Sequence, residues 1–347
     1  MGRKILWASL ALAPATLIAH WVFDLGHTPL FVLSALALVP LAWLIGEATE
    51  HAGEHTGPGV GGFLNATFGN APELIIALLA IDHNLPDVVR GSLTGSVVSN
   101  ILLVLGAALI FGGEGRLDRA SLLAQLGLVL FAVILFLIPA IPSWHGDPER
   151  HSLALLTIPP SIALLLVYAG VTALNLRRHR RIHATSDRAE GAWWSMRSAL
   201  LALGLATVAT AFVSDVLVES LETFGSAVGL SDFFIATVII AIVGNAAEHG
   251  GAVVVARRGK IKLATEIAVS SSAQVALLVT PAVALLSFAF PHPLPLSFRP
   301  VELAAMGGAA AVVALTVRDG VARRWEGFML VGFYAVVVLG FYLAGDR

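Results

Sequence analysis

The chain has 347 residues, of which 57% are hydrophobic and 13% are charged, and its net charge at pH 7 is −2. Soluble domains carry about 25% charged residues, so this composition excludes an ordinary water-soluble protein and indicates a membrane protein. The near-neutral charge gives no reason to expect a nucleic-acid partner. The sequence contains no cysteine, which excludes disulfides, thiolate metal sites and cysteine nucleophiles.

The first apolar run extends from Ile5 to Phe23 and follows a short basic start. It resembles a secretory signal peptide, with small residues from Ala11 to Ala15 in the place of a cleavage site. Because the run continues past Pro14, we expect a retained membrane helix instead.

Ten further apolar runs are long enough to cross a bilayer, which takes about 20 residues. Short connectors rich in glycine, proline and charge separate them, and none of these connectors is long enough to form a soluble domain. The sequence therefore predicts an all-α polytopic membrane protein with eleven transmembrane helices, near residues 5–23, 30–48, 61–82, 87–112, 119–141, 152–176, 196–218, 231–256, 261–289, 300–317 and 326–344.

The lysines and arginines predict the orientation of these helices. If the N-terminus is cytoplasmic, all the lysines and arginines fall on the cytoplasmic side except Arg90, Arg150, Arg299 and Arg347. An excess of basic residues in cytoplasmic loops is the usual orientation signal. We therefore expect a multi-pass protein of the cell inner membrane, with its N-terminus in the cytoplasm and its C-terminus outside.

The longest polar stretch is a basic linker at residues 177–195, near the middle of the chain. It divides the sequence into a peripheral first helix at 1–29, a five-helix unit at 30–176 and a second five-helix unit at 196–347. Units with an odd number of helices have opposite orientations in the membrane. This is the arrangement of transporters built from inverted repeats, whose substrate sites lie near the bilayer midplane.

A short motif recurs in the two units. The first Glu motif is Phe68-Gly-Asn-Ala-Pro-Glu73, and the second Glu motif is Val243-Gly-Asn-Ala-Ala-Glu248. A serine followed four residues later by an amide comes 23 residues after the first glutamate and 22 after the second. These two pairs are Ser96 with Asn100 and Ser270 with Gln274. The shared order and spacing supports an inverted repeat.

The motifs place carboxylates in the middle of apolar spans, where a charge costs about 2.5–3.5 kcal/mol on insertion scales. Glycine, and proline in the first motif, weaken the helix just before each glutamate and free backbone carbonyls there. The resulting candidate ligands are all oxygens, which suit Ca²⁺ better than Mg²⁺ because Ca²⁺ accepts irregular coordination. They are Glu73, Glu248, Asn100, Gln274, Ser96, Ser270, Asn70, Asn245 and the carbonyls of Gly69 and Gly244.

Several of these residues have a structural interpretation as well. The two glutamates are also suited to a buried ion pair that holds helices together, although no lysine or arginine lies at the centre of any span to pair with them. The asparagines, Gln274 and the two serines are equally suited to hydrogen bonds between helices, and the glycines to close helix packing. His249 follows Glu248 directly and is a candidate proton relay or a packed histidine.

The two glutamates together suggest how exchange is coupled. Empty and ionised, they would repel each other without solvent to screen them. We therefore expect the protein to cross between inward-open and outward-open states only when Ca²⁺ or protons neutralise the pair. Glu73, Glu248 and His249 are the candidate proton-coupling residues.

At these residues the sequence resembles the Ca²⁺/cation antiporters, in the cation/proton exchanger branch. The blocks that carry the resemblance cover about a third of the chain, at 40–50, 61–77, 91–106 and from Val243 through Gln274. The resemblance implies Ca²⁺ efflux driven by protons, with Glu73 and Glu248 as shared sites and Asn100 and Gln274 as their polar partners. It also implies a peripheral first helix and a gating pair at 30–48 and 196–218. The sequence departs from the family pattern at Pro72, where threonine is usual, at Glu266, where a small residue is usual, and in its basic linker.

Two further groups of polar residues lie outside the Glu motifs, and one of them resembles an enzyme motif. His51-Ala-Gly-Glu-His55 matches a zinc-protease pattern but stands at a helix end before Thr-Gly-Pro-Gly. We interpret it, with Glu47 and Glu50, as a polar cytoplasmic mouth or a solvated helix end. Asp215, Glu219 and Glu222 form a similar acidic group on the outer side.

The expected function is a Ca²⁺/H⁺ antiporter rather than an enzyme, with Ca²⁺, H⁺ and the lipid bilayer as partners and no cofactor. Exchange with Na⁺ or another cation, and a passive cation channel, are the alternatives. Whether the protein forms a homo-oligomer is left open.

Overall fold

The computed structural model describes residues 2–23, 25–182 and 194–346, and nearly all of them are helical. Helices satisfy every backbone polar group internally, which lipid requires of a spanning segment. The first half contains α1 (Gly2–Ser9), α2 (Leu12–Trp21), α3 (His27–Phe68), α4 (Ala71–Asp82), α5 (Pro86–Val98), the π-helix η1 (Ser99–Val104), α6 (Leu105–Gly112), β1 (Gly115–Arg116), α7 (Arg119–Ser143) and α8 (His151–Ile182).

The second half of the chain is also almost entirely helical in its described residues. It contains α9 (Met196–Glu219), α10 (Leu221–Val228), α11 (Asp232–Phe234), the π-helix η2 (Ile235–Ile240), α12 (Ala241–Gly244), α13 (Ala246–Arg257), α14 (Ile261–Gln274), the π-helix η3 (Val275–Val279), α15 (Thr280–Leu286), η4 (Ser287–Ala289), α16 (Pro300–Thr316), η5 (Val317–Asp319), β2 (Val321–Ala322) and α17 (Arg324–Ala344). The strands β1 and β2 pair antiparallel and join the two halves at one end of the bundle.

Eight helices among the described residues are long and apolar enough to cross a membrane. A further bent pair, Leu221–Val228 with Asp232–Gly244, turns through 109° at its break. The expected count of eleven spans is not reached by this measure, because three expected spans are broken helices. These three are 5–23, split between α1 and α2, 61–82, split between α3 and α4, and 231–256, split between α12 and α13.

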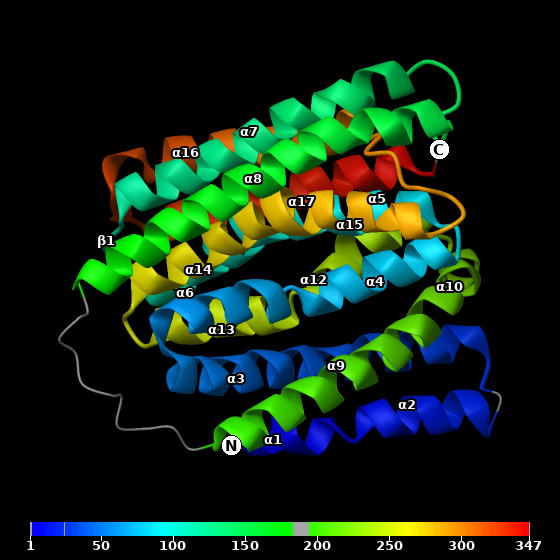
Figure 1. The fold of residues 1–347 in the computed structure, drawn as a ribbon, viewed down its shortest axis with the longest axis horizontal. Coiled ribbons are helices and arrows are strands. Elements are labelled where there is room, and N and C mark those ends of the chain that lie inside the picture. The colour runs from blue at the N-terminus through cyan, green and yellow to red at the C-terminus, as the bar shows by residue number, and fades with distance from the viewer. Residues whose placement is uncertain (1, 24, 183–193, 347) are drawn as a thin grey trace.

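The helices lie side by side, with α1 and α2 at one edge of the bundle and α7, α8 and α16 at the opposite edge (Figure 1). The helical stretch α3 reverses direction before it reaches α4, which then runs back beside it (Figure 1). The helix α8 continues to Ile182, past the expected start of the basic linker at 177, and residues 183–193 of that linker lie outside the described residues.

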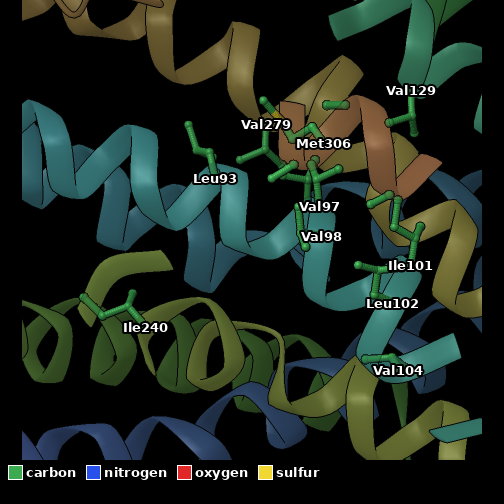
Figure 2. Close-up of a cluster of buried hydrophobic side chains, with 14 of the residues drawn as sticks. Leu93, Val97, Val98, Ile101, Leu102, Val104, Val129, Ile240, Val279 and Met306 are labelled. Atoms are coloured by element: carbon green, nitrogen blue, oxygen red, sulfur yellow. The ribbon is translucent and has the colours of Figure 1, made fainter. Parts of the chain in front are cut away.

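The segment α5–η1–α6 forms the centre of the bundle, because 83% of its apolar window is buried, the largest share among the spans. Figure 2 shows its side chains Val97, Val98, Ile101 and Leu102 within one buried apolar cluster that also includes residues of α7, α16 and η3. Gly95 allows α5 to approach η2 closely, since a Cβ at this position would clash with the Thr237 carbonyl.

The helices α3 and α9 pack against each other over much of their length. Near the cytoplasmic end expected from the sequence, Ile45 and Ala48 of α3 meet Leu203 and Ala206 of α9 in a separate apolar cluster. Near the other end, Phe31 stacks on Phe224 of α10 with ring centroids 4.2 Å apart. These are the helices that the family resemblance assigned to the gating pair.

Candidate functional site

Each Glu motif begins with a break in a helix, as the sequence predicted. In the first motif α3 ends at Phe68 and α4 begins at Ala71. In the second motif α12 ends at Gly244 and α13 begins at Ala246. The residue just before the second segment has nearly the same conformation in both places, with φ −95° and ψ 15° at Asn70 and φ −91° and ψ 16° at Asn245. The two motifs therefore share a local fold as well as a sequence.

Pro72 fits this local fold. It lies in the first turn of α4, where the backbone N–H that proline lacks would have no partner within the helix. The proline therefore stabilises the start of α4 without disrupting it, and a threonine hydroxyl is absent from this position.

Each glutamate lies in the first turn of the helix that follows the break, Glu73 in α4 and Glu248 in α13. The partial positive charge of a helix N-terminus favours a carboxylate there. The two carboxylates are close enough for their charges to interact. The break at Gly244 faces Glu73, because a Cβ on Gly244 would lie 3.6 Å from the Glu73 Cγ. The structure thus brings the two halves of the chain together at the two glutamates.

The side chain of Glu73 is buried, that of Glu248 is partly buried, and three of their four carboxylate oxygens have no hydrogen-bond partner in the described part of the chain. Only 7% of Glu73 is exposed. Within the described residues, both carboxylate oxygens of Glu73 and the Oε2 atom of Glu248 have no hydrogen-bond partner. A buried, unpaired carboxylate is costly unless a proton or a cation neutralises it. This pair of side chains therefore has the chemistry of a site for a cation or for protons.

A network of amides crosses between the two halves next to the glutamates. Asn100 of η1 donates hydrogen bonds to the Oδ1 atom of Asn245 and to the Oγ atom of Ser271, both at 3.0 Å. Asn245 in turn donates to the Oγ atom of Ser96 at 2.8 Å and to the Ala241 carbonyl at 2.8 Å. The Oδ1 atom of Asn100 is buried and has no hydrogen-bond partner among the described residues.

A matching contact joins the other two amides, since Asn70 donates to the Oε1 atom of Gln274 at 2.9 Å. In both halves the asparagine before a glutamate is thus bonded to the amide of the opposite half. These contacts are the hydrogen bonds between helices that the sequence left open for Asn70, Asn245, Asn100 and Gln274.

The two expected serine ligands, Ser96 and Ser270, have different hydrogen-bond partners. Ser96 joins the network, whereas the Ser270 hydroxyl donates to the carbonyl of Ile267 on its own helix. Its neighbours take its place, with Ser271 accepting from Asn100 and Ser272 donating to the Val97 carbonyl at 2.9 Å. Neither of these two residues was among the expected ligands. The run Ser270-Ser-Ser272 was the available signal, because consecutive residues on a helix cover several of its faces.

The amide-bearing helices depart from α-helical geometry at equivalent places. The π-helix η1 contains Asn100, and the π-helix η3 begins directly after Gln274. Such segments widen one turn of a helix and are often found at functional sites. Here they occur in the two helices whose amides bond to the Glu motifs.

His249 is partly buried in the same region, and its buried Nε2 atom has no hydrogen-bond partner among the described residues. Adjacent residues on a helix do not face each other, so His249 and Glu248 present their side chains in different directions. The assignment of His249 as a proton relay stays a prediction.

The two histidines of the zinc-protease pattern contact nearby carboxylates and Trp194. His51 lies between Glu47 and Glu54 at 3.6 and 3.1 Å and stacks on the Trp194 ring, with centroids 5.1 Å apart. His55 contacts the Trp194 carbonyl through Nε2 at 2.8 Å. Across the described residues, no group of three or more His, Asp or Glu side chains is arranged to hold a metal ion. This finding gives no support to a zinc site at His51 and His55.

The acidic group at the end of α9 also has partners. Asp215 pairs with His83, which follows α4, at 3.1 Å, and Glu219 lies 3.8 Å from His20 of α2. These contacts join three helices at the end of the bundle opposite to His51.

Comparison with known proteins agrees with this architecture. The model of the sodium/calcium exchanger protein family matches residues 27–177 and 198–343. The Ca²⁺/H⁺ antiporter ChaA of Bacillus subtilis is 36% identical over 339 residues, which cover 94% of each chain. A Ca²⁺/H⁺ antiporter of Synechocystis is 32% identical over 367 residues, covering 98% of this chain and 97% of its own.

A solved structure shows the same fold. The native structure of YfkE is 34% identical to this chain and superposes with a TM-score of 0.83, covering 98% of this chain and 99% of that one. Because the family model and these relatives span nearly the whole sequence, the chain belongs to the sodium/calcium exchanger protein family, in the branch of the Ca²⁺/H⁺ antiporters.

Proposed function

We propose that this protein is a secondary active transporter that exchanges cytoplasmic Ca²⁺ for external H⁺ by alternating access. Glu73 and Glu248 are the groups that Ca²⁺ and protons share. The observation that carries the proposal is the pair of neighbouring carboxylates, Glu73 buried and Glu248 partly buried, each at the start of a helix segment and neither in an ion pair with a described residue. The relatives named as Ca²⁺/H⁺ antiporters support this choice of ions.

The charge of the pair gives a physical reason for coupling. Two ionised carboxylates bind one Ca²⁺ without leaving net charge in the apolar core. Without the metal ion they repel each other, and protons neutralise them instead. A state in which neither Ca²⁺ nor protons are bound is therefore costly to move through the membrane. Return of the empty carrier is suppressed, and each Ca²⁺ leaving requires protons entering.

The remaining ligands are oxygens around the pair. Asn100 keeps its Oδ1 atom free for a cation, and Asn70, Asn245, Ser96 and Gln274 hold their positions through the network between the halves. The carbonyl of Gly69, in the first break, and that of Gly244, at the end of α12, complete the proposed ligand set. Ser270 contributes less than expected, because its hydroxyl is bonded to its own helix.

The proposed arrangement in the membrane follows the sequence. It has eleven spans in a cell inner membrane, with the N-terminus in the cytoplasm and the C-terminus outside. The two five-helix units are inverted repeats, and the nearly equal backbone angles at Asn70 and Asn245 support the repeat. His249 is the proposed relay between Glu248 and water.

Transport in inverted membrane vesicles tests this proposal. With an acidic interior, the wild type takes up Ca²⁺, and Glu73→Gln and Glu248→Gln each reduce the uptake rate at least about tenfold. Glu114→Gln is the matched control, because Glu114 is an exposed carboxylate in the turn before β1. Full uptake by both glutamine variants would overturn the assignment of the site.

Two further experiments distinguish Ca²⁺/H⁺ exchange from exchange with Na⁺ and from a passive channel. A sodium gradient that drives uptake as well as the pH gradient does would replace H⁺ with Na⁺ as the coupling ion. A Ca²⁺ current in planar bilayers without any opposing gradient would indicate a channel.

A further inference from the structure

A groove of about 460 Å³ opens between α16 and α17, beside the connection that joins them through η5 and β2. It lies at the end of the bundle where β1 pairs with β2, which is the end that we expect in the cytoplasm (Figure 1). None of the residues around the groove belongs to the candidate site. The groove is therefore separate from the proposed cation site.

Two apolar helix faces form the walls of the groove. On α16, Val312 and Leu315 lie three residues apart and share one side. On α17, Trp325, Met329 and Phe333 follow at intervals of four residues and share one face. With a rise of about 1.5 Å per residue, this face extends about 12 Å along α17. The hydrocarbon core of a bilayer is about 30 Å thick, so the groove fits within one leaflet.

The walls are open to the surrounding lipid. Leu315 is 64% exposed, Trp325 59% and Phe333 42%. Tryptophan is enriched where the hydrocarbon of a bilayer meets the polar headgroups, and Trp325 stands two residues after Arg323 at the charged end of the groove. The charged end is therefore at the depth of the headgroups, and the apolar walls lie beneath it among the acyl chains.

The charges at this end of the groove are used unequally. Arg323 donates to Asp319 at 2.6 Å and to Glu326 at 2.9 Å, so both carboxylates at the groove are already paired. Arg318 also lines the groove and is exposed, and it has no ion pair with any of the described residues. Guanidinium groups form strong, often bidentate hydrogen bonds with phosphate. Arg318 is thus the group at the groove that is left to bind an anion.

The surface around the groove is basic as well. A Cβ on Gly320 would lie 3.6 Å from the Cβ of Arg119, so the start of α7 brings a further arginine close to η5. Over residues 115–119 and 317–326, five arginines outnumber three carboxylates by two. Basic pockets between transmembrane helices on the cytoplasmic side bind anionic lipid headgroups. The arginines are Arg116, Arg119, Arg318, Arg323 and Arg324, and the carboxylates are those of Asp118, Asp319 and Glu326.

We propose that the groove between α16 and α17 binds an anionic phospholipid of the cytoplasmic leaflet. The lipid phosphate binds Arg318, and one acyl chain lies between Leu315 and the face of α17 that carries Met329 and Phe333. Because lipid tails are as apolar as these walls, the preference for one lipid over another comes from the charge of the headgroup. The inference goes beyond the proposed function, since it requires the place of the chain in a membrane but no transported ion.

Native mass spectrometry of the full-length protein in detergent tests the site. Phosphatidylglycerol is the probe, and phosphatidylcholine with the same acyl chains is the zwitterionic comparison. Arg318→Gln removes the proposed partner of the phosphate. Arg258→Gln is the matched control, because Arg258 is an exposed arginine in another connection on the proposed cytoplasmic side and does not line the groove.

We expect the wild type to bind phosphatidylglycerol more tightly than phosphatidylcholine. Arg318→Gln should weaken the binding of phosphatidylglycerol at least about fivefold, which is the contribution of one arginine near an anionic headgroup. Arg258→Gln should leave the dissociation constant unchanged. Equal binding of the two lipids by the wild type, or equal losses in the two variants, would overturn the proposal.

A second pair of variants tests the apolar part of the groove. Leu315→Trp fills the groove from α16, whereas Leu339→Trp adds the same side chain on α17 beyond the groove, where Leu339 is 56% exposed. Leu315→Trp should weaken the binding of phosphatidylglycerol, and Leu339→Trp should not. Binding by Leu315→Trp that equals the wild type would show that no acyl chain lies in the groove, and the site would be wrong.

A second copy of the chain is the competing occupant of the groove. In that case the spectra would show a dimer that Leu315→Trp dissociates, with no phosphatidylglycerol lost on Arg318→Gln, and the lipid would be excluded. Binding is measured without Ca²⁺ or a pH gradient. Failure of the lipid site therefore leaves the proposed function standing, and an absence of proton-driven Ca²⁺ uptake by wild-type vesicles leaves the lipid site standing.

Discussion

Asn70, in the break before α4, donates a 2.9 Å hydrogen bond to Gln274 of α14, a residue 204 positions later in the chain. The reciprocal contact is between Asn100 and Asn245, which lie 145 positions apart. Each half of the chain therefore supplies the amide that positions the other half's Glu motif. A site built in this way cannot form within one half alone.

Replacement of Asn245 with alanine should damage both the site and the fold. The change removes the hydrogen bond to Ser96 and one of the two hydrogen bonds that Asn100 donates, which costs about 1–3 kcal/mol. We expect a lower unfolding temperature in detergent and a Ca²⁺ uptake rate reduced about tenfold. Gln125→Ala is the control, because Gln125 bonds to Ser121 on the same helix α7. Equal behaviour of the two variants would show that the network between the halves has no special role.

Gly95 should not tolerate a methyl group. A Cβ at this position would clash with the Thr237 carbonyl and lie 2.7 Å from the Ala241 Cβ, and backbone atoms of a packed helix cannot move away cheaply. Gly95→Ala should therefore lower stability by several kcal/mol, seen as poor expression or a strongly reduced unfolding temperature.

Gly127→Ala is the matched control for Gly95→Ala. A Cβ added to Gly127 on α7 would have no atom within 4 Å, and alanine favours a helix by about 1 kcal/mol over glycine. The unfolding temperature of this variant should be unchanged or slightly raised. If Gly95→Ala behaved in the same way, the close approach of α5 and η2 would be wrong.

Arg90 should be important for stability although it is not part of the candidate site. Its side chain is 1% exposed and binds Asp87 at 2.6 Å, Glu149 at 2.7 Å and the Pro295 carbonyl at 3.3 Å. Arg90→Ala removes the partner of two partly exposed carboxylates and the packing of a fully buried side chain, which together cost at most the roughly 3 kcal/mol of a broken buried ion pair. The unfolding temperature in detergent should drop clearly.

An exposed ion pair provides the comparison for Arg90. Lys262 and Asp118 are 2.8 Å apart with side chains 60% and 35% exposed. Pairs of this kind contribute little, so Lys262→Ala should leave the unfolding temperature almost unchanged. A loss as large as that of Arg90→Ala would contradict the expected effect of burial.

His249→Asn tests the proposed relay. If His249 carries protons to Glu248, the variant should lose uptake rate at a given pH gradient while the Ca²⁺ concentration for half-maximal uptake stays the same. A side chain that only packs would leave both quantities unchanged, or would lower the unfolding temperature. Stopped-flow uptake at a series of external pH values distinguishes these results.

Much of this protein was predictable from the sequence because lipid restricts what a chain can do. Long apolar runs had to be helices, and the glycines, asparagines and proline of the Glu motifs correctly predicted the two helix breaks. The recurrence of the motifs by itself also identified Glu73 and Glu248 as related residues, although they are far apart in the chain.

Only the tertiary structure decided which polar side chains bond to one another. Ser271 rather than Ser270 bonds to Asn100, because the rotation of α14 about its axis depends on packing that no local pattern records. Arg90 was counted among the basic residues on the outer side, yet it is buried, because Glu149 and the segment at Pro295 fold over it from distant parts of the chain. A sequence shows which polar groups lie in apolar surroundings, whereas only the packed helices determine which of these groups meet.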